Sequence, residues 1–180
     1  MSAARLEHTP LLDVVLVHLD ASSDARGSTC TLLDPTLFGE AAAGSPLTYL
    51  AHSRSLWGVV RGLFVLGHET RVAVRAARGA AFLVVVDLRR GSPTHAKAWW
   101  RIVRATEPLW VHVPPGCAWG MQALDDGTEV EELRSSPCDD STPRLRWNDP
   151  ALGIPWPLPP RWLTERELQA PTLAAWQARP

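Results

Sequence analysis

The sequence has few of the residue types that build catalytic and metal-binding sites. Its 180 residues include one lysine, Lys97, and one tyrosine, Tyr49. The three cysteines are odd in number and far apart, which excludes a disulfide framework and a paired-cysteine metal site. We therefore expect neither a disulfide-stapled secreted fold nor a cysteine-ligated metal.

Long apolar runs and an excess of one charge are also missing. The apolar stretch at 11–19 is interrupted by Asp13 and His18, and it is shorter than the roughly 20 residues of a membrane span. Eighteen basic residues against nineteen acidic ones give a net charge of −1, which argues against nucleic-acid and membrane-surface binding. We expect a soluble, cytoplasmic protein with neither kind of partner.

The residues that are present are typical of one all-β domain. The length fits a single domain over residues 1–180, and a hydrophobic content of 46% excludes a disordered chain. Short apolar segments separated by turn residues are the pattern of a β-sandwich or β-barrel. The expected strands fall within residues 11–18, 47–51, 56–66, 71–77, 80–88, 99–105, 109–113, 118–124 and 129–133.

Turn and helix signals complete this prediction. Asp125-Asp126-Gly127 is a hairpin-turn sequence, and Gly58, Gly62 and Gly67 mark bends or bulges in and after the apolar segment at 56–66. Short peripheral helices are expected at 35–43 and at 164–170, the second with a capping box at its start. Five prolines make 150–160 an ordered coil rather than a strand.

Eight short strings occur in a fixed order between residues 24 and 172. They are Asp24-Ala25-Arg26-Gly27, Ser53-Arg54-Ser55, Arg61-Gly62-Leu63, Val85-Val86-Asp87-Leu88-Arg89, Ser92-Pro93-Thr94, Pro114-Pro115-Gly116-Cys117-Ala118-Trp119-Gly120, Trp147-Asn148-Asp149-Pro150 and Ile154-Pro155-Trp156-Pro157. In this order and spacing they resemble the dTDP-4-dehydrorhamnose 3,5-epimerase family. The resemblance implies a cupin, a jelly-roll β-barrel that is usually a homodimer and holds a small-molecule substrate inside the barrel.

Members of that family act on a dTDP-4-keto-6-deoxy sugar by acid–base chemistry next to the C4 ketone. The resemblance places the family's base His at Phe64, its Lys at Val72 and its Tyr acid at Glu132. A second family His falls on Trp119, and the Asp that orients the base falls near Glu167. Because the chain's only lysine and only tyrosine lie elsewhere, no shifted alignment restores the set. We expect standard 3,5-epimerase activity to be absent.

These replacements change the expected interior from polar to apolar. Tyr49, Phe64, Leu66, Trp119 and Met121 fall at or next to positions that face the ligand in the family. They are expected to line a pocket for a largely apolar ligand. Two alternatives stay open, namely that the rings simply fill the core and that a sugar site survives.

Glu132 is the candidate catalytic residue. It shares strand parity with Val130, so it points into the barrel if Val130 does. Desolvation there would raise its pKa and suit it to proton transfer. The alternative, which the run of acidic residues favours, is that Glu129, Glu131 and Glu132 form an exposed acidic edge.

Arg26 and Arg61 are the candidate anion-binding residues. The resemblance implies that such arginines help to hold the nucleotide and its phosphates, for which a guanidinium is well suited. A structural ion pair is the alternative for each. The aromatic residue and the acid that follow in the family are Thr29 and Thr31 here, so the stacking part of that strand is missing.

We expect no metal and no other cofactor. Metal-binding cupins carry a His-x-His pair and a further His in a Pro-x-Gly-x-x-His turn. This chain has no such pair among its six histidines, and the turn ends in Trp119.

Three functional hypotheses remain. The leading one is a repurposed cupin of a biosynthetic pathway that binds a largely apolar intermediate and promotes isomerisation or cyclisation by holding a reactive conformer. The second is a 4-keto-6-deoxy sugar 3- or 3,5-epimerase that uses replacement groups such as Glu132, His68 or Arg71. The third is a catalytically silent binding homologue.

Overall fold

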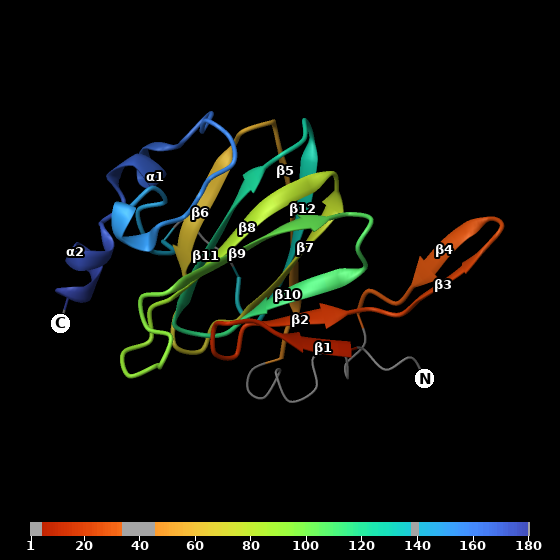
Figure 1. Ribbon diagram of the computed structural model, residues 1–180, viewed down its shortest axis with the longest axis horizontal. Helices are drawn as coiled ribbons and strands as arrows, with labels where there is room; N and C mark the ends of the chain where they lie inside the picture. Colours follow the sequence, from red (N-terminus) through yellow and green to blue (C-terminus); the bar gives the residue numbers. More distant parts are fainter. Residues whose placement is uncertain (1–4, 34–45, 138–140, 180) are drawn as a thin grey trace.

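The computed structural model describes residues 5–33, 46–137 and 141–179, which form two antiparallel sheets that face each other (Figure 1). The larger sheet has the spatial order β1 (Arg5–His8), β2 (Val15–His18), β10 (Leu109–Val113), β7 (Val72–Arg78), β12 (Thr128–Arg134) and β5 (Tyr49–Ser55). The smaller sheet has the order β6 (Val60–Val65), β11 (Cys117–Ala123), β8 (Ala80–Asp87) and β9 (Ala98–Arg104). The prediction of an all-β fold is confirmed.

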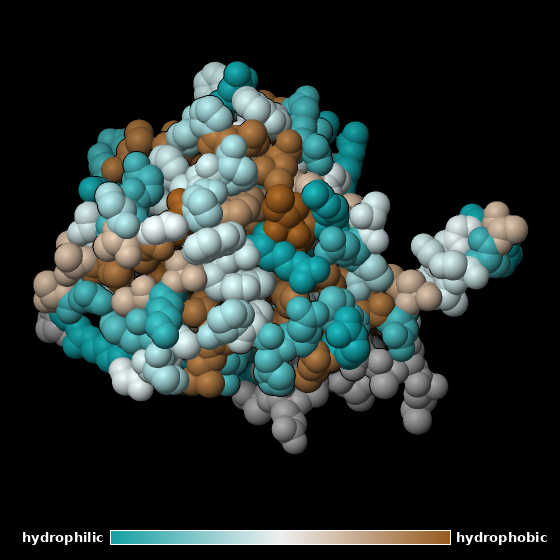
Figure 2. All heavy atoms as spheres, in the orientation of Figure 1, coloured by the Kyte–Doolittle hydropathy of each residue, from teal (hydrophilic) through white to brown (hydrophobic). Residues whose placement is uncertain are grey.

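The remaining elements are short and peripheral. A 3₁₀ turn (Pro150–Leu152), α1 (Glu165–Gln169) and α2 (Leu173–Gln177) lie on one side of the sheets. The hairpin of β3 (Ala21–Asp24) and β4 (Gly27–Cys30) projects on the other side and stands clear of the body (Figures 1 and 2). In the described ranges, no helix has the length and apolar character that crossing a membrane requires.

Most of the expected elements are found. Each of the nine predicted segments overlaps one strand, and of the three glycines expected at bends or bulges, Gly62 lies at a β-bulge. The helix expected at 164–170 is α1, which starts with the expected capping box between Thr164 and Glu167. The sequence does not predict β1, β3, β4 or α2. The strands β1, β3 and β4 are largely exposed on both faces, so they have no apolar alternation to detect. The helix expected at 35–43 lies outside the described residues.

The prediction of a hairpin at Asp125-Asp126-Gly127 is wrong. A turn is present, and Gly127 has a φ of +74° there. However, the turn carries the chain from β11 in the smaller sheet to β12 in the larger one. Gly79, with a φ of +68°, makes the same crossing between β7 and β8. Turn residues indicate where the chain reverses, but not whether the flanking strands pair with each other.

The core fills the space between the sheets. Alternate residues of both sheets point inward and form one apolar cluster, as strand parity requires. Val72, which is fully buried in this cluster, stands where the resemblance places a lysine. A second cluster covers the outer face of the smaller sheet, where the C-terminal segment contributes Leu145, Trp147, Leu152 and Leu173.

A buried carboxylate explains one of the strings on which the resemblance rests. Asp87 is fully buried at the end of β8 and accepts hydrogen bonds from Arg89 at 2.8 and 2.9 Å and from Ser92 and Thr94 at 2.6 Å. Burial opposes ionisation, but these donors outweigh it and hold the pKa of Asp87 well below its ordinary value. Arg89 also binds Asp13, so this string closes a loop rather than a ligand site.

His112 is buried on the outer face of β10, opposite to the inward-facing Val111 and Val113. Its Nδ1 lies 3.4 Å from the backbone oxygen of Asp13. Burial, and secondarily the charge of Arg71, lowers the pKa of His112 to about 4. The folded protein therefore keeps this imidazole neutral at pH values where an unfolded chain would protonate it.

We predict that stability falls as the pH drops through this window. The unfolded chain takes up the proton near pH 6.5 and the folded chain only near pH 4, so stability is lost as the pH falls between these values. From pH 7 to pH 5 the loss due to His112 is about 2 kcal/mol. We would measure the free energy of unfolding in urea at pH 7 and at pH 5. The decrease between the two pH values should be smaller in His112→Asn than in the wild type by this amount. The exposed His8→Asn is the control, and an equal loss in wild type and His112→Asn would contradict the assignment.

Candidate functional site

A pocket of about 500 Å³ opens where the chain passes from β5 into β6, against the C-terminal segment. Its polar lining residues are Arg54, Ser55, Arg61, Arg144, Thr164, Arg166 and Glu167. Its apolar lining residues are Leu56, Val59, Val60, Phe64 and Trp162. Four arginines against one glutamate make the pocket cationic.

A β-bulge places two of these residues on the same side of β6. Phe64 pairs with Trp119 and Gly62 pairs with Gly120, so β6 has one residue more than β11 at this point. Arg61 and Phe64, three positions apart, therefore both line the pocket instead of facing opposite sides. Only glycine fits at Gly62, because its φ is +108° and a Cβ there would lie 2.8 Å from the backbone oxygen of Trp119.

Arg61 is held by neutral groups. Its Nε donates to Ser55 Oγ at 2.8 Å, and its Nη2 donates to the backbone oxygen of Arg54 at 3.3 Å. Within the described residues no carboxylate lies within 4 Å of this exposed guanidinium. Arg61 is therefore positioned by the β5–β6 connection while its charge stays available to a ligand.

A three-layer stack forms the floor of the pocket. The guanidinium carbon of Arg144 lies 4.1 Å from the centroid of the Phe64 ring, and the rings of Phe64 and Trp119 are 5.2 Å apart. Trp119 is 1% exposed and belongs to the core between the sheets. Arg144 also lies 3.7 Å from Glu167. A ligand in the pocket thus meets a cation over an aromatic ring, and the rings fill the space below.

Glu132 lies on the inward face of β12 together with Val130, which is in the core. Its side chain is 15% exposed and accepts a hydrogen bond of 2.9 Å from Nη1 of the buried Arg134. Burial raises the pKa of Glu132, while the charges of Arg134, Arg61 and Arg144 oppose the rise. Arg61 and Arg144 line the pocket, whereas Glu132 is not among its lining residues and is reached by their charges from the inward face of β12.

The interpretation of Glu132 as part of an exposed acidic edge is therefore wrong. Its neighbours Glu131 and Glu129 lie on the outer face, 3.0 Å from Arg75 and 3.8 Å from Arg78, and they too are only partly exposed on a strand inside the sheet. Three acidic residues in four look alike in sequence. Strand parity and the burial of Val130 separate Glu132 from the other two.

Of the five residues expected to line one apolar pocket, four pack in or against one core cluster, and Tyr49 lies apart from them. Only Phe64 lines the pocket described above. Leu66, Trp119 and Met121 are at most 3% exposed and pack in the core, whereas Tyr49 is 47% exposed on the edge strand β5. The side chains of the first three fill the interior because large apolar residues face each other across it.

Arg26 does not reach this site within the chain. It lies in the turn of the projecting hairpin, where its side chain is 90% exposed and its Nη2 is 2.6 Å from Asp24. Its ion pair is thus a surface pair, and anion binding by Arg26 stays a prediction.

Sequence reasoning missed Arg144, Trp162 and Arg166. Arg144 meets Phe64 through an isolated bridge outside the regular strands, and Trp162 follows the proline-rich coil. The sequence around Arg144 and Trp162 has no periodic pattern, because the position of each residue depends on how the C-terminal segment folds back over the sheet. In the described part of the chain, no group of three or more His, Cys, Asp or Glu side chains is arranged to hold a metal ion.

Comparison with known proteins agrees with this fold. The family model described as dTDP-4-dehydrorhamnose 3,5-epimerase matches residues 8–175. A dTDP-4-dehydrorhamnose 3,5-epimerase of Pseudomonas aeruginosa is 35% identical over 165 residues, which cover 88% of this chain and 87% of that protein.

Two solved structures confirm the cupin jelly roll. NovW, a 4-keto-6-deoxy sugar epimerase from the novobiocin gene cluster of Streptomyces spheroides, has a TM-score of 0.89 at 29% identity, covering 97% of this chain and 89% of its own. ChmJ, a 3'-monoepimerase from Streptomyces bikiniensis solved with dTDP-quinovose, has a TM-score of 0.86 at 26% identity, covering 94% and 88%. The chain therefore belongs to the dTDP-4-dehydrorhamnose 3,5-epimerase family.

Proposed function

We propose that the protein binds a 4-keto sugar nucleoside diphosphate in the arginine-lined pocket and exchanges a proton at one carbon beside the ketone, with Glu132 as the proton carrier. The observation that carries this proposal is the inward-facing Glu132, 15% exposed, on which the charges of the pocket residues Arg61 and Arg144 act. NovW and ChmJ support the substrate class, because their names describe epimerases of such sugars.

The charge of the pocket supports a diphosphate. Arg61, Arg144 and Arg166 line it with one carboxylate, Glu167, among them. The guanidinium of Arg54 instead lies beside Gly127, so that residue contributes its backbone. Guanidinium groups bind phosphate oxygens in pairs, and a volume of about 500 Å³ suits a ligand of this size.

The state of Glu132 supports proton transfer. A raised pKa brings a carboxylate closer to the strength that a general base needs near neutral pH. The C–H proton passes to Glu132, and its electron pair moves onto the ketone oxygen as an enolate, which the nearby cations stabilise. The proton then returns from Glu132 or from water. The other carboxylate of the site, Glu167, accepts from the backbone N–H of Thr164 and lies 3.7 Å from Arg144. We therefore assign proton transfer to Glu132 alone and expect exchange at one carbon rather than epimerisation at two.

A catalytically silent binder is the second candidate. The ion pair of Glu132 with Arg134 and the contact between Phe64 and Trp119 favour it, because both fill space and fix a side chain. The hypothesis of a largely apolar ligand has less support, since the pocket is cationic and the aromatic rings below it pack together.

We predict that thymidine diphosphate binds and that Arg61 is needed for it. At 100 times the dissociation constant, the nucleotide should stabilise the wild type by about 2.7 kcal/mol. Arg61→Gln should weaken binding about tenfold or more in calorimetry, since a charge-assisted contact contributes roughly 1.5–3 kcal/mol. Arg78→Gln, on the outer face, is the matched control. Equal affinities of wild type and Arg61→Gln would exclude this pocket.

Proton exchange separates the two candidates. In deuterium oxide, the wild type should introduce deuterium at one of C3 and C5 of dTDP-4-keto-6-deoxyglucose, as followed by proton NMR. Glu132→Gln should reduce the rate about 10²-fold or more, as expected for loss of a general base, while nucleotide affinity stays the same. Binding without exchange in the wild type would establish the silent binder instead.

The ion pair beneath the pocket gives a stability prediction. Glu132→Gln leaves Arg134, which is 2% exposed, without its carboxylate and should cost about 2–4 kcal/mol in urea unfolding. The double variant Glu132→Leu with Arg134→Met should cost much less than the sum of the single changes. Additive costs would show that the two side chains do not depend on each other. The outer pair Arg75 and Glu131, treated in the same way, is the control.

A further inference from the structure

Trp162 is unusually exposed for a tryptophan. At 75% it has the largest exposed fraction among the large hydrophobic residues that the structure describes. It also lines the arginine-rich pocket. The other aromatic lining residue, Phe64, is covered by Arg144, so Trp162 presents the open aromatic surface of this pocket.

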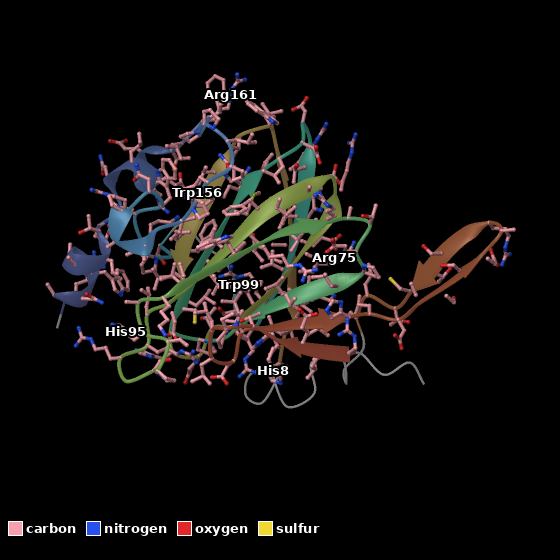
Figure 3. All side chains as sticks on the ribbon, viewed as in Figure 1. His8, Arg75, His95, Trp99, Trp156 and Arg161 are labelled. Carbon is pink, nitrogen blue, oxygen red and sulfur yellow. The ribbon has the colours of Figure 1, made fainter. Side chains whose placement is uncertain are left out.

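The backbone on both sides of Trp162 is fixed. Arg161, at the edge of the molecule in Figure 3, donates its backbone N–H to Gly58 at 2.8 Å and stacks its guanidinium on Trp57 at 4.7 Å. On the other side, Thr164 donates its backbone N–H to the carboxylate of Glu167 at 3.0 Å. The indole is therefore held at the rim by anchored neighbours.

The conformation of Trp162 is one that a bulky residue adopts only under constraint. Its φ is +53°, in the left-handed region. In the described chain, the other non-glycine residues with positive φ are Asp13 and Ala96, both smaller. The fold thus holds the large Trp162 ring in a defined, exposed position, where its burial contributes little to the stability of the protein.

We propose that Trp162 is the stacking platform for the base of the nucleotide. This inference rests on the proposed function, because it needs the phosphates to lie on Arg61 and Arg166. When a base stacks on an exposed indole, the two ring faces that meet are removed from water. Such stacking changes affinity by about 5- to 150-fold. The platform would replace the aromatic residue that is missing near Thr29. Since every base has a flat face, Trp162 would provide affinity for the nucleoside without selecting one base.

Calorimetry with two probes tests the platform, thymidine diphosphate and inorganic pyrophosphate. Trp162→Ala should weaken thymidine diphosphate binding about tenfold and leave pyrophosphate binding unchanged, because pyrophosphate has no base. Trp162→Phe should restore most of the affinity for the nucleotide. Trp100→Ala, an exposed tryptophan on β9, is the control, and unchanged melting temperatures would show that each variant is folded.

Each other outcome overturns the inference at an identifiable step. Unchanged nucleotide affinity in Trp162→Ala excludes stacking on this ring, while the pocket itself still stands. An equal loss for both probes shows that Trp162 shapes the phosphate site instead. A lack of rescue by Trp162→Phe also contradicts stacking. If the wild type binds neither probe, the proposed function fails before the platform is reached.

Discussion

The contact between Phe64 and Trp119 joins the arginine-lined pocket to the core. The ring centroids are 5.2 Å apart, Phe64 lines the pocket, and Trp119 is buried between the sheets. Arg144 lies over the Phe64 ring and adds a cation to this wall of the pocket. On this account, the packed rings keep a ligand outside the core and beside the arginines.

The position of that contact depends on a single backbone irregularity. The bulge at Gly62 turns Arg61 and Phe64 to the same side of β6, so a cation and an aromatic ring share one wall. The neighbouring β5 supplies Ser55 to orient Arg61, and β12 brings Glu132 to the same end of the molecule. The consecutive strands β5 and β6 therefore meet β12 and the returning C-terminal segment, which are distant from them in sequence.

Much of the fold follows from the sequence, because apolar alternation and turn residues are local signals. They predict the nine strands and the capped helix α1, and they mark Gly62 as a bend or bulge. Strand parity allows an inward Glu132, although the run of acidic residues favoured an exposed edge. They do not show that the turn at 125–127 joins two different sheets, since pairing is a tertiary property. Arg144 and Trp162 were missed for a related reason. Their roles arise only when an irregular segment folds over β6, and no periodic pattern records that.

The most direct test of this account is a crystal structure of the protein with thymidine diphosphate. The account predicts a nucleotide in the mouth of the pocket, with its phosphate oxygens within hydrogen-bond distance of Arg61 and the rings of Phe64 and Trp119 still in contact. A nucleotide that lies between the two sheets, with these rings moved apart, would contradict the claim that the packed rings keep a ligand outside the core.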